Sequence, residues 1–167
     1  MDPLGPKDTA RLQAAYGFLG QGNHESAALE LDGIDPQSGN HPGVLSARLS
    51  LAHASKQWEK CLELVERLIA AQPGNPVFWV HRATFMCELG RAQEAWDQLL
   101  PATERFPKFW MVPYTLAGIA CLSGNHEEAI RHLQLACTLA DPQFIKAKAL
   151  EERDLQPIRS RMIEACG

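Results

Sequence analysis

Hydrophobic residues recur along the chain at the spacing of amphipathic helices, and the whole pattern repeats every 34 residues. Each period predicts a first helix, a short turn and a second helix. Mostly small residues form one column on the first helices and another on the second helices: Ala15, Leu49, Ala83 and Ala117, then Ala27, Cys61, Ala95 and Ala129. Because small side chains let helix backbones approach closely, these columns predict where paired helices cross.

The turn between the two predicted helices holds, in successive periods, Gly22, Lys56, Gly90 and Gly124. Glycine adopts the left-handed conformation that ends a helix without a Cβ penalty. Asn23 and Asn125 come next and are typical residues of a helix N-cap. The nearly identical strings GNHESA and GNHEEA are therefore predicted to be turns, not two catalytic His-Glu pairs.

The third period carries the most complete set of signature residues, which are Trp79, Ala83, Gly90, Ala95 and Pro107. On this basis residues 8 to 142 resemble the tetratricopeptide repeat (TPR), a helix-turn-helix unit of 34 residues. The resemblance implies an all-α, right-handed solenoid of four TPR hairpins within residues 1–143. The expected limits of the repeats are 8–41, 42–75, 76–109 and 110–143.

Two prolines and one long connection depart from the regular pattern. Pro101 falls within a predicted second helix and should kink or shorten it, whereas Pro113 should set the start of a first helix. The stretch DPQSGNHPG, which begins at Asp35, is longer than its counterparts and predicts the loosest join between hairpins.

After Pro142 the repeat gives way to a segment in which Leu155, Ile158 and Met162 recur at helical spacing among charged residues. An open stack of repeats needs an end with one polar face. Residues 144–167 are therefore predicted to form a C-terminal capping helix. The alternative is a tail that imitates a peptide and docks in the groove of a neighbouring molecule.

Composition restricts the choice of partner. The chain of 167 residues is 46% hydrophobic, and its net charge of -4 gives no basic surface for nucleic acid or anionic lipid. No apolar run approaches the ~20 residues of a membrane span, and the five cysteines lack CxxC spacing. We expect a cytoplasmic protein with reduced thiols that binds neither nucleic acid nor membrane.

No set of residues predicts an enzyme. In HEEAIRH the two histidines, His126 and His132, are too far apart in the sequence, because a zinc-protease helix needs them four positions apart on one face. The glycines of GFLGQG close a predicted helix, whereas a dinucleotide-binding fingerprint opens one. We therefore expect no catalytic residue, no metal and no cofactor.

His53, Cys87 and Cys121 share one column on three successive first helices. Imidazole and thiolate are ligands that zinc favours, but packed helices lie ~8 to 10 Å apart and zinc bonds are only ~2 Å long. The distance favours ordinary packing or groove residues, with a metal or redox ladder as the alternative.

In TPR proteins the first helices line a concave surface that receives a peptide, and the resemblance implies the same here. The candidate groove residues are Leu12, Tyr16, Ser50, Val77, Val80, His81, Thr84, Met111, Tyr114 and Thr115. The positions that form a basic carboxylate clamp in some members are here Leu12, Tyr16, Ala47, Val77 and His81, so the clamp is absent. The groove suits an apolar or aromatic anchor of a peptide. Packing between adjacent helices is the alternative explanation for its apolar residues.

The resemblance thus implies a non-catalytic scaffold or adaptor with a protein or peptide partner, whose identity the sequence does not reveal. A self-associating structural subunit, forming a homo-oligomer, is the second hypothesis. Phe109 and Trp110 bear on it, because they either seal the junction between repeats three and four or form an aromatic patch for association.

Overall fold

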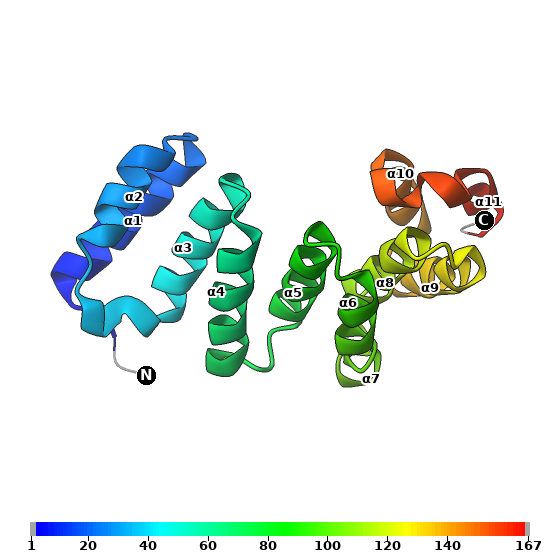
Figure 1. Ribbon diagram of the computed structural model, residues 1–167, viewed down its shortest axis with the longest axis horizontal. Helices are drawn as coiled ribbons and strands as arrows, with labels where there is room; N and C mark the ends of the chain where they lie inside the picture. The colour runs from blue at the N-terminus through cyan, green and yellow to red at the C-terminus, as the bar shows by residue number, and fades with distance from the viewer. Residues whose placement is uncertain (1–2, 166–167) are drawn as a thin grey trace. The chain divides into compact units, whose positions relative to one another are not determined.

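The computed structural model describes residues 3–165, and every regular element in this range is helical. The elements are α1 (Pro6–Gly20), α2 (His24–Asp32), η1 (Pro36–Asn40), α3 (Pro42–Ala54), α4 (Trp58–Ala71), α5 (Pro76–Glu88), α6 (Ala92–Leu99), α7 (Ala102–Arg105), α8 (Met111–Leu122), α9 (His126–Leu139), α10 (Pro142–Glu151), η2 (Arg153–Ile158) and α11 (Arg159–Ala165). The prediction of an all-α helical-repeat fold is confirmed (Figure 1).

The chain forms two compact units, residues 1–78 and 79–167, which we call the N-terminal unit and the C-terminal unit. In the N-terminal unit α1 pairs with α2 and α3 pairs with α4, and both helices of the first hairpin also contact α3. In the C-terminal unit α8 and α9 form a hairpin, α6 packs on α8, and the elements after residue 142 pack on this hairpin. Helix α5 begins in one unit and continues into the other.

The predicted turns are left-handed. The φ angles of Gly22, Gly90 and Gly124 are 71°, 74° and 74°. Lys56, at the same place in the second repeat, has a φ of 52°, which costs a residue with a Cβ roughly 1–2 kcal/mol. The two asparagines cap the helices that follow, as predicted: Asn23 accepts the N–H of Ser26 at 3.1 Å, and Asn125 accepts the N–H of Glu128 at 3.4 Å.

The two unusual prolines have the predicted local effects. Helix α6 ends at Leu99 and α7 begins at Ala102, so Pro101 divides the second helix of the third repeat. Pro113 lies in the first turn of α8, where its missing N–H leaves no intrahelical bond unmade.

The long connection between α2 and α3 is anchored by side chains from both hairpins of the N-terminal unit. The buried Asp8 carboxylate accepts the Ser38 hydroxyl at 2.7 Å and the N–H of Asp35 at 3.2 Å, and these bonds hold the pKa of Asp8 below its ordinary value. Arg67 donates to the Asn40 side chain at 2.6 Å. The connection is therefore a fixed 3₁₀ turn, and the sequence pattern did not reveal the residues that fix it.

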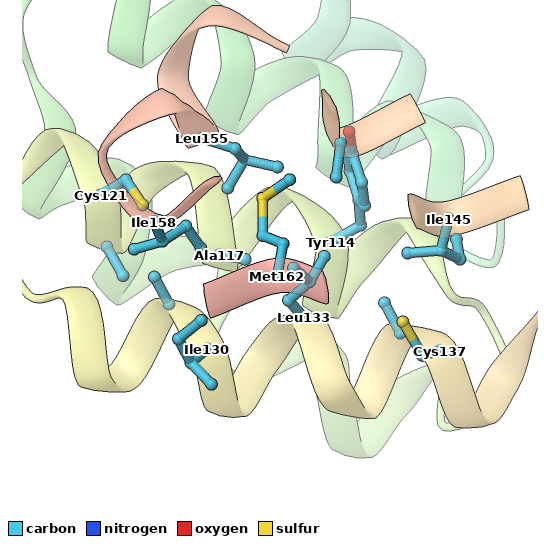
Figure 2. Packing of buried hydrophobic residues seen from close by; sticks show 14 residues of the cluster. Tyr114, Ala117, Cys121, Ile130, Leu133, Cys137, Ile145, Leu155, Ile158 and Met162 are labelled. Carbon is cyan, nitrogen blue, oxygen red and sulfur yellow. The ribbon is translucent and has the colours of Figure 1, made fainter. Parts of the chain in front are cut away.

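The core of the C-terminal unit joins α8 and α9 to the end of the chain. Figure 2 shows Leu155, Ile158 and Met162 directed toward Ala117 and Leu133. All five side chains are at most 1% exposed. The end of the chain is thus part of the core and covers α8, rather than lying loosely on the last hairpin.

The predicted C-terminal capping helix is divided into three short elements: α10, η2 and α11. Glu152 has an extended backbone and ends α10, while Pro157 lies within η2 and cannot donate a backbone hydrogen bond. The helical spacing of Leu155, Ile158 and Met162 predicted the buried side of this segment correctly. The expectation of one continuous helix is wrong.

Candidate partner-binding faces

The N-terminal unit presents first-helix residues on α1 and α3, which we call the N-terminal face: Leu12, Tyr16, Leu19, Ser46, Ser50 and His53. Leu12 and Leu19 are half-buried against the core of this unit. The Tyr16 hydroxyl donates to the carbonyl oxygen of Gly43 at 3.0 Å, which joins α1 to α3. The side chain is nevertheless 44% exposed. Partial burial raises the pKa of Tyr16, so the phenol is neutral at physiological pH.

The α3 part of the N-terminal face is polar and uncharged in character. Ser50 is exposed, and its hydroxyl donates back to the carbonyl oxygen of Ser46 at 3.1 Å. His53 is exposed and meets the edge of the Trp58 ring at a centroid distance of 5.6 Å. This face therefore offers an aromatic ring, two half-buried leucines and neutral hydrogen-bonding groups.

The C-terminal unit presents the equivalent residues on α5 and α8, which we call the C-terminal face: Val80, His81, Thr84, Cys87, Glu88, Met111, Tyr114, Thr115 and Cys121. Val80 is buried, so it supports the face from beneath. His81 is half-buried and stacks on Phe85 with ring centroids 5.8 Å apart. Thr84 is exposed, and its hydroxyl donates to the carbonyl oxygen of Val80 at 3.1 Å. Val77, the remaining candidate, is half-buried at the start of α5.

Tyr114 is only 7% exposed, because the end of the chain covers it. Its ring lies edge-on to Trp110 at 5.6 Å and under the Lys148 ammonium at 5.5 Å. The hydroxyl donates to Glu152 at 3.4 Å, and Glu152 also pairs with Lys148 at 3.8 Å. Burial, followed by the Glu152 carboxylate, raises the pKa of Tyr114. Tyr114 therefore joins α8 to α10, while Met111 and Thr115 remain half-buried.

Cys87 and Cys121 occur at equivalent positions near the ends of α5 and α8, and both carry free thiols. Burial and the Asp154 carboxylate raise the pKa of each thiol to about 11, and Glu88 adds to the effect at Cys87. Neither thiol is ionised at neutral pH, so neither is an activated nucleophile.

The other cysteines and the proposed metal ladder can be placed as well. His53 lies in the N-terminal unit, whereas Cys87 and Cys121 lie in the C-terminal unit. Among the residues that the structure describes, no group of three His, Cys, Asp or Glu side chains could hold a metal ion. Cys61 is a free, buried thiol, whereas Cys137 is disulfide-bonded, which differs from the expectation that all the thiols are reduced.

A polar depression of about 270 Å³ lies elsewhere in the C-terminal unit, lined by Gln93, Trp96, Ala120, Ser123, Asn125 and Glu128. Next to it, His132 meets the edge of Trp96 at 5.2 Å and donates from Nε2 toward Glu128 at 3.4 Å. The Nδ1 atom is buried and has no hydrogen-bond partner within the described residues. Burial lowers the pKa of His132, so the imidazole is neutral at physiological pH.

The sequence reasoning missed two acidic residues that shape the C-terminal face, Glu152 and Asp154. They act on residues far away in the sequence, namely Tyr114, Cys87 and Cys121. The only signal for their position was the apolar spacing of the segment that follows, which predicts a buried side but not the surface that it covers.

Comparison with known proteins places the fold. No family model and no curated protein matches the chain. Among solved structures, MamA from Desulfovibrio magneticus RS-1 is similar with a TM-score of 0.71 and 15% identity, over 98% of this chain and 95% of MamA. A TPR protein of Thermus thermophilus gives 0.66 and 17%, over 95% and 98%. PilF of Pseudomonas aeruginosa gives 0.69 and 22%, over 95% and 72%.

At these identities the likeness concerns the fold alone, and the fold is that of a tetratricopeptide-repeat protein. The resemblance found in the repeat columns is thereby confirmed at the level of architecture. None of the helices within residues 3–165 combines the length and the apolar character that crossing a membrane requires.

Proposed function

We propose that the chain is a non-catalytic protein-interaction scaffold, located in the cytoplasm, that binds a peptide segment of a partner protein on the first helices of its repeats. The observation that carries the proposal is the Tyr16 ring. It is 44% exposed although its hydroxyl is fixed to the backbone of α3, and half-buried leucines flank it on α1. A fixed, amphipathic aromatic ring is a typical anchor at a protein interface, because little conformational entropy is lost when it binds.

The two faces contribute differently to this proposal. On the N-terminal face, Leu12 and Tyr16 would contact an apolar side chain of the peptide, and Ser50 would offer a hydrogen bond. On the C-terminal face, the accessible candidates are His81, Thr84, Met111 and Thr115. Val80 and Tyr114 would act as supports beneath the surface, and Val77 would lie at the margin of the N-terminal unit.

The chemistry of the described side chains supports a role without catalysis. A nucleophilic cysteine requires a depressed pKa, whereas the pKa values of Cys61, Cys87 and Cys121 are all raised by burial. Burial also lowers the pKa of His132, whose Nε2 contacts Glu128 and not a nucleophile. These groups do not form the nucleophile, base and orienting residue that covalent catalysis needs.

A peptide library displayed on phage tests the proposal directly. Peptides selected on the wild-type protein should lose binding to a Tyr16→Ala, Ser50→Arg double variant. They should retain binding to Leu29→Ala, a control that removes a side chain 68% exposed on the second helix α2. Circular dichroism confirms that all variants are folded. The proposal is overturned if no peptide is enriched, or if the double variant binds the selected peptides as well as the wild type does.

Self-association is the second candidate function, and one observation favours it. Phe144 is 51% exposed and meets the edge of Trp110 at 5.4 Å, so two aromatic rings share one surface of the C-terminal unit. Light scattering at increasing protein concentration would show a rising mass. Phe144→Ser should abolish the increase and Leu29→Ser should not.

A further inference from the structure

We infer that the C-terminal face selects a partner segment that carries a lysine or arginine, and that this cation docks beside Cys87 and Cys121 between the carboxylates of Glu88 and Asp154. The inference rests on the proposed function, because it specifies the charge of the partner at one of the two faces. The backbone repeat, the packing of η2 and the pattern of charge each contribute to it.

The repeat places the two thiols and their neighbours in corresponding positions. Cys87 and Glu88 end α5, and Cys121 and Leu122 end α8. Thr84, one turn earlier on α5, and Leu122, which is 48% exposed, leave this end of the face accessible. The docking position is thus formed by the final turns of two first helices.

The end of the chain brings a further carboxylate to this position. Element η2 packs on α8, and Leu155 and Ile158 belong to the same core cluster as Cys121 (Figure 2). Asp154 directly precedes Leu155 and is half-buried, so the buried leucine fixes the backbone that carries this carboxylate.

The charges at this position are negative and are not neutralised by an ion pair within the described residues. Within residues 3–165, neither Glu88 nor Asp154 takes part in such a pair, although carboxylates elsewhere in this unit, such as Glu127 with Arg161, do. The raised pKa values of Cys87 and Cys121 agree with this, since carboxylates are the only charges that act on the two thiols. The C-terminal ends of α5 and α8 add the negative ends of two helix dipoles.

A long basic side chain matches this combination of surfaces. Its aliphatic stem would pack on Leu122 and the neutral thiols, while its charged head would reach Glu88 and Asp154. The corresponding end of the N-terminal face has Leu19 on α1 and His53 on α3, with no carboxylate at the position of Glu88, where Ala54 stands. The preference for a cation is therefore specific to the C-terminal unit.

The peptide selection described above provides the probe. Enriched peptides should contain more lysine and arginine than the starting library. A synthetic copy of one such peptide should bind Asp154→Asn or Glu88→Gln about five-fold more weakly than the wild type, and the double variant roughly ten-fold more weakly, as expected for charge-assisted bonds in a partly exposed site. The matched control is Glu59→Gln, an exposed carboxylate on α4, which should leave affinity unchanged.

The outcomes separate this inference from the proposed function. Peptides that bind but show no basic enrichment, or whose affinity is the same for Asp154→Asn, Glu88→Gln and the wild type, overturn the inference and leave the scaffold proposal standing. A selected peptide whose arginine is replaced by citrulline gives a second test, because it should bind the wild type about ten-fold more weakly and the double variant without further loss. Failure to enrich any peptide overturns both.

Discussion

The N-terminal face and the C-terminal face are built from the same repeat, but they are completed by different parts of the chain. On the N-terminal face, the Tyr16 ring is 44% exposed and the surrounding groups are neutral. On the C-terminal face, Tyr114 is 7% exposed beneath α10, and Asp154 from η2 stands beside the thiols. The repeat therefore determines where a surface forms, whereas the end of the chain determines which surface remains open and what charge it carries.

This difference has a simple structural origin. A repeat stack must bury the side of its last hairpin, and here α10, η2 and α11 cover α8 and α9. Because η2 is short and contains Pro157, its polar residues are directed to different surroundings from those of one continuous helix. Covering the core and charging the face are thus two results of the same segment.

The largest effect is expected from removing this cover. Leu155→Ala deletes a side chain that is fully buried between α8 and the end of the chain, so the free energy of unfolding should fall by about 3 kcal/mol. Chemical denaturation measures the loss. Cys121 should also react faster with a thiol reagent, which would make the C-terminal face as open as the N-terminal one. Leu29→Ala, at an exposed site, should change stability by less than about 0.5 kcal/mol.

The turns offer a smaller and more local comparison between the units. Gly124→Ala should lower the free energy of unfolding by about 1–2 kcal/mol, because its φ of 74° is left-handed and no neighbouring atom restricts an added Cβ. Lys56→Gly should raise it by about 1 kcal/mol, because the same conformation is already strained there.

The control for the turns is Gly17→Ala, within α1, where a Cβ also meets no neighbouring atom. This substitution should stabilise the protein by about 0.5–1 kcal/mol. If Gly124→Ala is equally stabilising, the left-handed turn is not what limits this position.

The features that could be predicted from sequence are those whose cause lies within a few residues. Gly22 and Asn23 determine a turn and a cap locally, and Pro101 breaks its own helix, so the hairpins were predictable. Even Lys56 was predictable, because its place in the column required a left-handed residue whatever its side chain.

The features that escaped prediction depend on contacts between distant residues. The Asp8 bonds to the connection after α2 and the position of Asp154 beside Cys121 arise only when helices pack. Composition gave a net charge of -4 for the chain but not its concentration at one face. The exposure of Tyr16 and the burial of Tyr114 likewise follow from where the chain ends in space, because both are tyrosines on first helices.

The two tyrosines provide a third comparison, with a smaller effect. Tyr16→Phe removes the bond to the Gly43 carbonyl and should lower the free energy of unfolding by about 1 kcal/mol. Tyr114→Phe should cost about 0.5 kcal/mol, because its bond to Glu152 is long at 3.4 Å and Glu152 keeps its pairing with Lys148. Thermal unfolding measures both. A larger loss for Tyr114→Phe would show that this hydroxyl, and not the buried ring, holds α10 in place.

The smallest effect at neutral pH concerns His132, and it distinguishes the C-terminal unit only in acid. Burial lowers the folded-state pKa of His132 below the ordinary value of 6.5, because a charged imidazole would be desolvated beside Trp96, against a partly opposing attraction from Glu128. As the pH falls below 6.5, the unfolded chain therefore binds a proton more readily than the folded one, and stability declines. Above about pH 7 both states are neutral and the contribution disappears. His132→Phe should flatten the loss of melting temperature between about pH 7.5 and 5.5, whereas His126→Phe, at an exposed site, should not; equal slopes for wild type and His132→Phe would contradict the assignment.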